Sequence, residues 1–142
     1  MSIISYNIST NKELLNVHFI HNYISAISYW GKGRTLEEVK STIENSLCFG
    51  VYTDEKVQIG FARVVTDYTF FGYIMDVIID EKYQRKGIGK RLISFILNNK
   101  IIKNLSTVAL KTKDAQELYI KYGFKTIGDS PLWMSMDKQN LE

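Results

Sequence analysis

One segment, Tyr73 to Asn98, constrains the fold more than any other part of the chain. An apolar run ending at Asp80 predicts a buried strand, and after a short polar turn comes the glycine-containing sequence QRKGIG, residues 84–89. A helical pattern follows at once, with its apolar members spaced for one buried face: Ile88, Leu92, Ile93, Phe95 and Ile96. The first turn of a helix leaves backbone N–H groups unpaired, and its dipole favours an anion. The segment therefore predicts an anion site at the turn, to which nearby basic side chains add charge: Arg85, Lys86, Lys90 and Arg91.

Known nucleotide motifs do not account for this turn. The P-loop pattern G-x-x-x-x-G-K-[ST] is absent, and the third glycine of a dinucleotide fingerprint is replaced by Leu92. The pattern Q-x-x-G-x-G after an apolar strand instead resembles the acetyl-CoA signature of the GCN5-related N-acetyltransferase (GNAT) superfamily. Downstream, residues 115–124 (AQELYIKYGF) resemble the A-x-x-L-Y-x-x-x-G-F segment of the same superfamily. With their surrounding elements, the two motifs cover roughly Leu47 to Ile127.

Composition is consistent with one domain spanning residues 1–142, since 45% of the chain is hydrophobic, and the resemblance implies that it is a single N-acetyltransferase domain. Mean hydropathy is −0.12, no apolar run approaches the ~20 residues of a membrane span, and the first residues lack the pattern of a signal peptide. The single cysteine, Cys48, lies in an apolar run, which favours buried packing over a nucleophile. These features predict a cytoplasmic protein. The net charge of +3 is largely local to the glycine turn, so neither a nucleic-acid nor a membrane partner is expected.

The remaining pattern predicts an α+β fold: a mixed, mostly antiparallel sheet of about six to seven strands flanked by about four helices. Thr35 and Glu38 form a capping-box signature at the start of one helix, and residues 12–28 carry a broader helical pattern with a suspected break. The helices are expected at residues 12–28, 35–45, 88–98 and 115–122. The strands are expected at residues 3–8, 47–53, 57–66, 70–79, 107–111, 125–127 and 133–136, with the fifth parallel to the fourth.

The resemblance implies how acetyl-CoA would bind. Backbone N–H groups of the glycine turn would hold the pyrophosphate, and the pantetheine arm would pair with the backbone of Val77 to Ile79 where that strand diverges from the next. A bulge near Asp76 or Val77 is the usual device for opening such a gap, and a backbone N–H near Val77 would polarise the thioester carbonyl. Side chains of that strand could equally be core. The expected cofactor-binding residues are Val77, Ile78, Ile79, Gln84, Arg85, Lys86, Gly87, Ile88, Gly89, Lys90 and Asp114, of which Asp114 could instead be a helix N-cap.

Two residues are the candidates for catalysis. Tyr119 stands at the tyrosine of the family's L-Y-x-x-x-G-F segment, which often protonates the departing thiolate; its alternative is a core residue. Histone-directed members carry a glutamate near what is here Tyr73, and this chain has no carboxylate there. Asp76 is the only acid inside the strand, where it could accept a proton, position the amine or hydrogen-bond a neighbouring loop. A water chain is an equally good base.

Tyr29, Trp30 and Arg34 lie in a loop with two glycines and are the expected substrate-binding residues, with packing under the sheet as the alternative for the aromatic side chains. The expected function is an acetyl-CoA-dependent N-acetyltransferase, without a metal, in which a primary amine of a small molecule or protein attacks the thioester directly. The alternative is a non-catalytic acetyl-CoA-binding sensor or interaction module. A homodimer through the C-terminal strands stays open.

Overall fold

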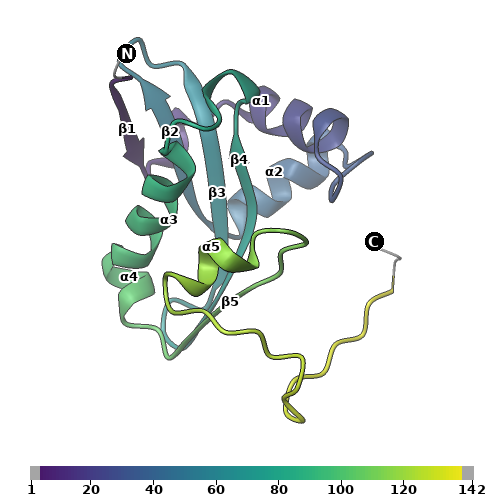
Figure 1. Ribbon diagram of the computed structural model, residues 1–142. Coiled ribbons are helices and arrows are strands. Elements are labelled where there is room, and N and C mark those ends of the chain that lie inside the picture. Colours follow the sequence, from purple (N-terminus) through teal and green to yellow (C-terminus); the bar gives the residue numbers. More distant parts are fainter. Residues whose placement is uncertain (1–3, 139–142) are drawn as a thin grey trace. The chain divides into compact units, whose positions relative to one another are not determined.

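A five-stranded sheet in the order β1-β2-β3-β4-β5 lies at the centre of the first of two units, residues 1–110 and 111–142 (Figure 1). The computed structural model describes residues 4–138. Neighbouring strands are antiparallel except β4 and β5, which are parallel as the sequence predicts. The strands are β1 (Tyr6–Ser9), β2 (Leu47–Thr53), β3 (Gln58–Thr66), β4 (Phe71–Ile79) and β5 (Thr107–Leu110). The first strand was expected at residues 3–8 and is observed at Tyr6–Ser9. Residue 3 of the expected range lies outside the described residues.

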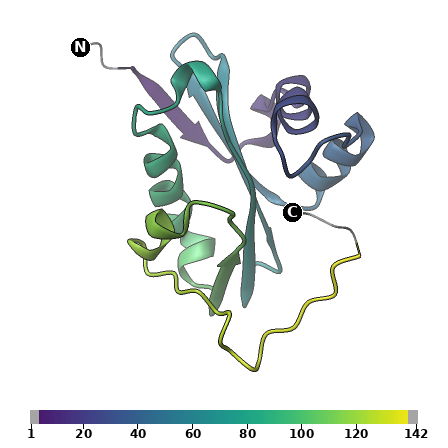
Figure 2. The same cartoon turned by 45° about the vertical axis from the view of Figure 1, so that its right-hand side comes forward.

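Helices cover both faces of this sheet. Figure 2 shows α1 (Val17–Asn22) and α2 (Leu36–Glu44) on one side, and α3 (Ile88–Asn98) and α4 (Lys100–Lys103) on the other. The core on the α1–α2 side consists of buried residues from both helices and three strands: Ile20, Ile24, Val39, Ile43, Cys48, Phe61 and Ile78. On the α3 side the apolar face of the helix is buried as predicted, except Phe95, which is 41% exposed and meets Phe49 edge-on with ring centroids 6.1 Å apart.

The helical pattern over residues 12–28 is interrupted, which confirms the suspected break. A 3-10 helix, η1 (Lys12–Leu14), comes first, and Asn16 then caps α1 by accepting a hydrogen bond from the Phe19 N–H at 3.0 Å. A π-helical turn, η2 (Tyr23–Ile27), follows α1 directly. The capping box that begins α2 is present: Thr35 Oγ1 accepts from the Glu38 N–H at 3.1 Å, and the Glu38 carboxylate accepts from the Thr35 N–H at 2.8 Å.

The count of six to seven strands is wrong for the described residues, and so is the count of four helices. Five α-helices are present among the described residues, and the one that the sequence did not predict is α4. Asn99 caps the start of α4 by accepting hydrogen bonds from the Ile101 and Ile102 N–H groups. The strands expected at residues 125–127 and 133–136 do not form. The Ser130 N–H instead donates to the Ile127 carbonyl at 2.9 Å in a turn before Pro131, which has no N–H to give a sheet. A strand also needs a hydrogen-bonded neighbour, and no sheet pairing within residues 4–138 includes this segment.

The second unit contains the short helix α5 (Gln116–Ile120) and the turn that ends it. Gly123 has φ 96°, which confirms its expected left-handed conformation. The Phe124 N–H donates to the Tyr119 carbonyl at 3.2 Å and the Gly123 N–H to the Ile120 carbonyl at 3.0 Å. These two bonds define a Schellman motif. The last residue of α5 is Ile120, two residues before the expected boundary at Tyr122.

Cys48 packs in the core as predicted. It is 1% exposed, and burial raises the pKa of its thiol to about 11, so the thiol stays protonated and unreactive near neutral pH. Within residues 4–138, no three or more His, Cys, Asp or Glu side chains gather in a group that could hold a metal ion. None of the helices in that range is long and apolar enough to cross a bilayer.

Tyr52 carries a buried hydroxyl group for which no hydrogen-bond partner exists among the described residues. The side chain is 4% exposed and lies over Gly50, and burial raises the pKa of its phenol to about 12.

Leaving a buried hydroxyl unpaired costs about 1–3 kcal/mol. We therefore expect Tyr52→Phe to raise the free energy of unfolding by about 1 kcal/mol, measured by chemical denaturation. The matched control is Tyr23→Phe, which removes a hydroxyl that accepts a hydrogen bond from Gln84 and should give no gain. Equal stability of Tyr52→Phe and the unsubstituted protein would show that the hydroxyl is satisfied.

Candidate active site

The glycine turn presents unpaired backbone N–H groups, as the sequence predicts. A short 3-10 helix, η3 (Glu81–Tyr83), leads from β4 into the turn. Arg85 and Gly87 both have left-handed backbones, with φ 62° and 82°, and α3 begins at Ile88. Within residues 4–138 the N–H groups of residues 85–89 have no hydrogen-bond acceptor. Successive N–H groups around left-handed residues at a helix start form a concave anion-binding surface.

Gln84 differs from the rest of the turn, because its side-chain amide forms hydrogen bonds to other residues of the protein. Its Nε2 donates to the Ile79 carbonyl at 2.8 Å and to the Tyr23 hydroxyl at 3.3 Å. The amide thus ties the end of β4 to the helical segment on the α1 side of the sheet. A contact of Gln84 with a cofactor stays a prediction; what its side chain does is hold the turn at the end of β4.

Strand β4 contains the bulge that acetyl-CoA binding would require. Phe61 pairs with Ile78 and Arg63 pairs with Met75, so Ala62 alone faces both Asp76 and Val77. Asp76 takes the left-handed conformation, φ 53°. The extra residue reverses the alternation of side chains: by these pairings Ile74, opposite Val64, and Ile78, opposite Phe61, face opposite sides of the sheet.

The same strand has a free edge beyond the bulge. Its parallel pairing with β5 begins at Phe71 with Thr107 and ends at Ile74 with Leu110. No sheet pairing among the described residues continues on that side over residues 75–79, although β3 still pairs with the other edge. The side chain of Ile78 is buried in the core, while Val77 and Ile79 are partly exposed. The side chain of Ile78 is therefore core, and the backbone edge of this stretch is available; its pairing with a pantetheine arm stays a prediction.

The Asp76 carboxylate is a buried hydrogen-bond centre. Its side chain is 1% exposed; Oδ1 accepts from Trp30 Nε1 at 3.0 Å, and Oδ2 accepts from Arg34 Nη1 at 2.8 Å and from Arg63 Nε at 2.6 Å. Arg63 Nη1 also donates to the Ser46 hydroxyl at 3.1 Å. Of the roles considered for Asp76, this geometry shows the hydrogen bond to a neighbouring loop. A role as proton acceptor stays a prediction.

Sequence reasoning missed Arg63, although a signal existed. It is an arginine inside the apolar strand run VQIGFARVV, and a charge in a buried strand needs a partner. Asp76 was the only acid in the neighbouring strand run, so the pair could have been inferred from those two positions. Tyr23 gave no such signal, because an aromatic residue in a helical pattern is ordinary core.

The expected substrate-binding residues meet in one loop between η2 and α2. Trp30 and Arg34 both reach Asp76, while Tyr29 is 52% exposed and meets the Trp30 ring edge-on, with centroids 5.4 Å apart. The loop bends at Gly33, φ 80°, and a ring nitrogen of His21 lies 3.0 Å from the Arg34 carbonyl oxygen. The loop is therefore held from both sides, and the two aromatic residues differ in that the Trp30 indole binds Asp76 while the Tyr29 side chain is half exposed.

In the second unit, Tyr119 occupies a position with a structural explanation of its own. It supplies the first carbonyl of the Schellman motif, and its ring meets Phe124 edge-on with centroids 5.7 Å apart. A hydrophobic contact between these two positions commonly accompanies the motif. Burial also raises the pKa of the Tyr119 phenol, so the group is protonated at neutral pH but is a weaker acid than an ordinary tyrosine. The tyrosine, glycine and phenylalanine of the segment thus form one helix cap.

Asp114 does not cap α5, so that interpretation is wrong. Its side chain is exposed, and the hydroxyl of Thr112 accepts the hydrogen bond from the Ala115 N–H at 3.1 Å instead. A contact of Asp114 with the cofactor stays a prediction.

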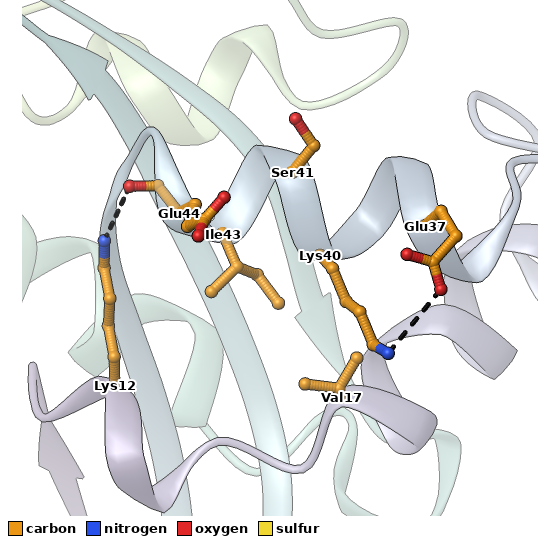
Figure 3. A pocket seen from close by; sticks show the side chains of 7 residues that line it. All are labelled: Lys12, Val17, Glu37, Lys40, Ser41, Ile43 and Glu44. Carbon is orange, nitrogen blue, oxygen red and sulfur yellow. Dashed lines mark hydrogen bonds and ion pairs between the residues drawn. The ribbon is translucent and has the colours of Figure 1, made fainter.

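A surface hollow of about 590 Å³ lies elsewhere in the first unit, between η1, α1 and α2 (Figure 3). It is lined by Lys12, Val17, Glu37, Lys40, Ser41, Ile43 and Glu44, and by none of the sequence-predicted site residues. Lys12 Nζ donates to the backbone carbonyl of Glu44 at 3.2 Å, and Lys40 forms an ion pair with Glu37 at 3.6 Å.

A bulged fourth strand with a free edge, followed by a basic glycine turn at a helix start, defines an acetyltransferase fold. A family model described as an acetyltransferase (GNAT) domain matches residues 44–126, more than half of the 142 residues. The chain belongs to the GNAT family of acetyltransferases, whose members use acetyl-CoA.

Individual relatives agree with this assignment. A solved structure of a GNAT-family protein from Xanthomonas campestris pv. campestris has a TM-score of 0.88 at 31% identity and covers 99% of this chain and 96% of that chain. The ycf52 protein of Gracilaria tenuistipitata var. liui, named an uncharacterized N-acetyltransferase, is 30% identical over 77% of this chain. The histone acetyltransferase TAP1 of Glycine max is 34% identical over 51% of it. The chain spans 60% of the Gracilaria protein and 32% of the Glycine max protein.

Proposed function

We propose that residues 1–142 form a single N-acetyltransferase domain that moves an acetyl group from acetyl-CoA to a primary amine of a small molecule or protein. One observation carries the proposal: the free N–H groups of residues 85–89 and the free edge of β4 past its bulge are joined only by the short helix η3. The first surface suits a pyrophosphate and the second suits an amide-containing arm that adds to a sheet edge. Bound there, acetyl-CoA would supply the acetyl group as a thioester.

The chain's own groups divide the work. Backbone N–H groups of the turn, with the charges of Arg85, Lys86 and Lys90, would bind the phosphates. The backbone of Val77 to Ile79 would hold the arm, and an N–H near Val77 would polarise the carbonyl as negative charge develops on it. The open space around a Cβ at Gly87 fits this role, because the backbone there can be approached closely.

Removal of the amine proton falls to water in this proposal, with Asp76 as a positioning residue. The two oxygens of Asp76 together already accept three hydrogen bonds, one from each of three side chains, and the Asp76 side chain is 1% exposed. An amine that reached this carboxylate would have to displace a guanidinium or an indole. The structure gives Asp76 a more direct task, which is to fix the loop carrying Trp30 and Arg34 against the bulge.

Tyr119 is the proposed proton donor to the departing thiolate, and its hydroxyl can be tested apart from its ring. Tyr119→Phe keeps the contact with Phe124 and should leave stability unchanged within about 0.5 kcal/mol. We expect kcat to fall about tenfold, because water can partly replace a single acid, while the Kd for acetyl-CoA stays the same. Steady-state kinetics and calorimetric titration measure the two. Tyr122→Phe, three residues away, is the control and should keep full turnover; an unchanged kcat in Tyr119→Phe would remove the acid role.

The helix-cap role of Tyr119 favours one second candidate, a non-catalytic acetyl-CoA-binding module. Because the cap alone explains why a tyrosine is at this position, its presence is no longer evidence for catalysis. The two functions separate in one assay. Purified protein is given acetyl-CoA and polyamines, aminoglycosides, amino acids or peptides, and free thiol is followed. Amine-dependent thiol release supports the transferase; saturable acetyl-CoA binding without release for any amine supports the module.

A further inference from the structure

The charges around the bulge do not balance. Arg34 and Arg63 both donate to one oxygen of Asp76, so two guanidinium groups share a single carboxylate. The three side chains are 20%, 7% and 1% exposed, respectively, so the surplus positive charge is largely shielded from water. A buried charge without a counter-ion is costly, and such a site favours binding of an anion.

Only one of the two arginines has hydrogen-bonding capacity left at the surface. Arg63 uses Nε on Asp76 and Nη1 on Ser46, and it is the more deeply buried. Arg34 uses Nη1 alone, and its remaining N–H groups have no acceptor among residues 4–138. A guanidinium presents a planar fork of donors that matches the oxygens of a carboxylate or phosphate.

Glu38 is an acid that also acts on Arg34, and it does not cancel the surplus. Glu38 interacts with Arg34 through charge alone, since its carboxylate accepts the hydrogen bond from the Thr35 N–H of the capping box. Glu38 is fully exposed, so water screens its field. Arg34 therefore keeps a net attraction for an anion on its open side.

The position of Arg34 connects this charge to the proposed reaction. Its Nη1 is 2.8 Å from the carboxylate of Asp76, and Asp76 is itself one of the two residues of the β4 bulge. Tyr29, 52% exposed, lies in the same loop and stacks edge-on against Trp30, which also binds Asp76. An amine that attacks a thioester held at the bulge would lie within a side chain's reach of this arginine.

We propose, resting on the transferase function above, that the acceptor is a small amine that also carries an anionic oxygen group, a carboxylate or a phosphate monoester, which Arg34 binds. The amine then reaches the bulge while its anionic end is fixed in the loop. Polycationic acceptors such as polyamines and aminoglycosides are disfavoured by the same charge.

The test compares matched acceptors that differ only in the anionic group: an amino acid against its amide, and glucosamine 6-phosphate against glucosamine. In the unsubstituted protein we expect kcat/KM for the anionic member of at least one pair to be higher by about tenfold or more. A preference within the amino-acid pair indicates that Arg34 binds a carboxylate, and a preference within the glucosamine pair indicates that it binds a phosphate. Added salt should raise KM for the anionic member and change that of its counterpart without the anionic group much less.

Variants assign the preference to Arg34. Arg34→Gln should reduce the ratio to about twofold or less, mainly through KM, while Arg34→Lys should retain part of it because the charge stays and the fork is lost. Lys32→Gln is the matched control, since it removes one positive charge from the same loop at an exposed position, and should keep the full ratio. Unchanged acetyl-CoA affinity in Arg34→Gln shows that the fold and the donor site are intact.

Three results would overturn the inference: a preference for the neutral or polycationic amines, equal rates within both pairs, or a preference that survives Arg34→Gln. In those cases transfer still occurs, so the proposed function stands. Acetyl-CoA binding with no transfer to any amine would instead contradict the proposed function together with this inference.

Discussion

Asp76→Asn is expected to lower the free energy of unfolding by about 3–5 kcal/mol, the usual cost of removing one partner from a buried ion pair. The asparagine cannot neutralise either guanidinium, and its amide NH₂ group would face donors. Arg34 and Arg63 would then be left as two largely buried cations, 20% and 7% exposed, with no carboxylate between them. Urea denaturation followed by circular dichroism measures the change.

The matched control is Glu37→Gln, which removes a carboxylate whose ion pair with Lys40 at 3.6 Å is on the surface. We expect less than about 0.5 kcal/mol there. A second readout tests the loop itself: in a Trp133→Phe background, Trp30 fluorescence reports on the indole that Asp76 binds, and Asp76→Asn should shift it towards that of an exposed indole. A loss below about 1 kcal/mol with an unshifted spectrum would contradict the network described.

Gly87→Val is expected to raise the Kd for acetyl-CoA by about a hundredfold. Gly87 has φ 82°, a region that a β-branched residue rarely adopts, so valine should force the turn to change its backbone. Hydrogen bonds from N–H groups to a charged acceptor contribute about 1.5–3 kcal/mol each, and misplacing two of them corresponds to a hundredfold or more. Calorimetric titration with acetyl-CoA measures the affinity.

Gly33→Val separates backbone strain from loss of the site. Gly33 has φ 80°, nearly that of Gly87, and at both positions an added Cβ would meet open space. Both variants should therefore lose similar stability, about 1–2 kcal/mol, but only Gly87→Val should lose acetyl-CoA affinity. Equal loss of affinity in the two variants, or none in Gly87→Val, would show that the turn does not hold the phosphates.

Local signals in the sequence predicted the parts of this molecule that depend on near neighbours. Thr35 and Glu38 predicted a capping box, Gly123 predicted a left-handed helix end, and the run from Gln84 to Gly89 predicted a turn before a helix. Each feature is determined by residues within one or two helical turns, so one stretch of sequence is sufficient evidence.

Features that depend on pairing between distant segments were harder to predict. The bulge at Asp76 arises from the register of β4 against β3, and the acid's partners come from two other segments, at Arg34 and Arg63. The same limit explains the two strands expected near the C-terminus: residues 133–136 are mostly apolar, but a strand forms only with a hydrogen-bonded neighbour. Binding of an acceptor by the loop that carries Tyr29, Trp30 and Arg34 stays a prediction, and the two arginines that share the Asp76 carboxylate appeared only with the contacts.

The most direct test of the proposed function is the stoichiometry of transfer. Purified protein is incubated with acetyl-CoA and an amine, free thiol is measured by absorbance, and acetylated amine is measured by mass spectrometry in the same sample. The account predicts one acetylated amine for each thiol released, with both products absent when the amine is omitted and strongly reduced in Gly87→Val. Saturable acetyl-CoA binding with no acetylated amine, or thiol release independent of any amine, would contradict it.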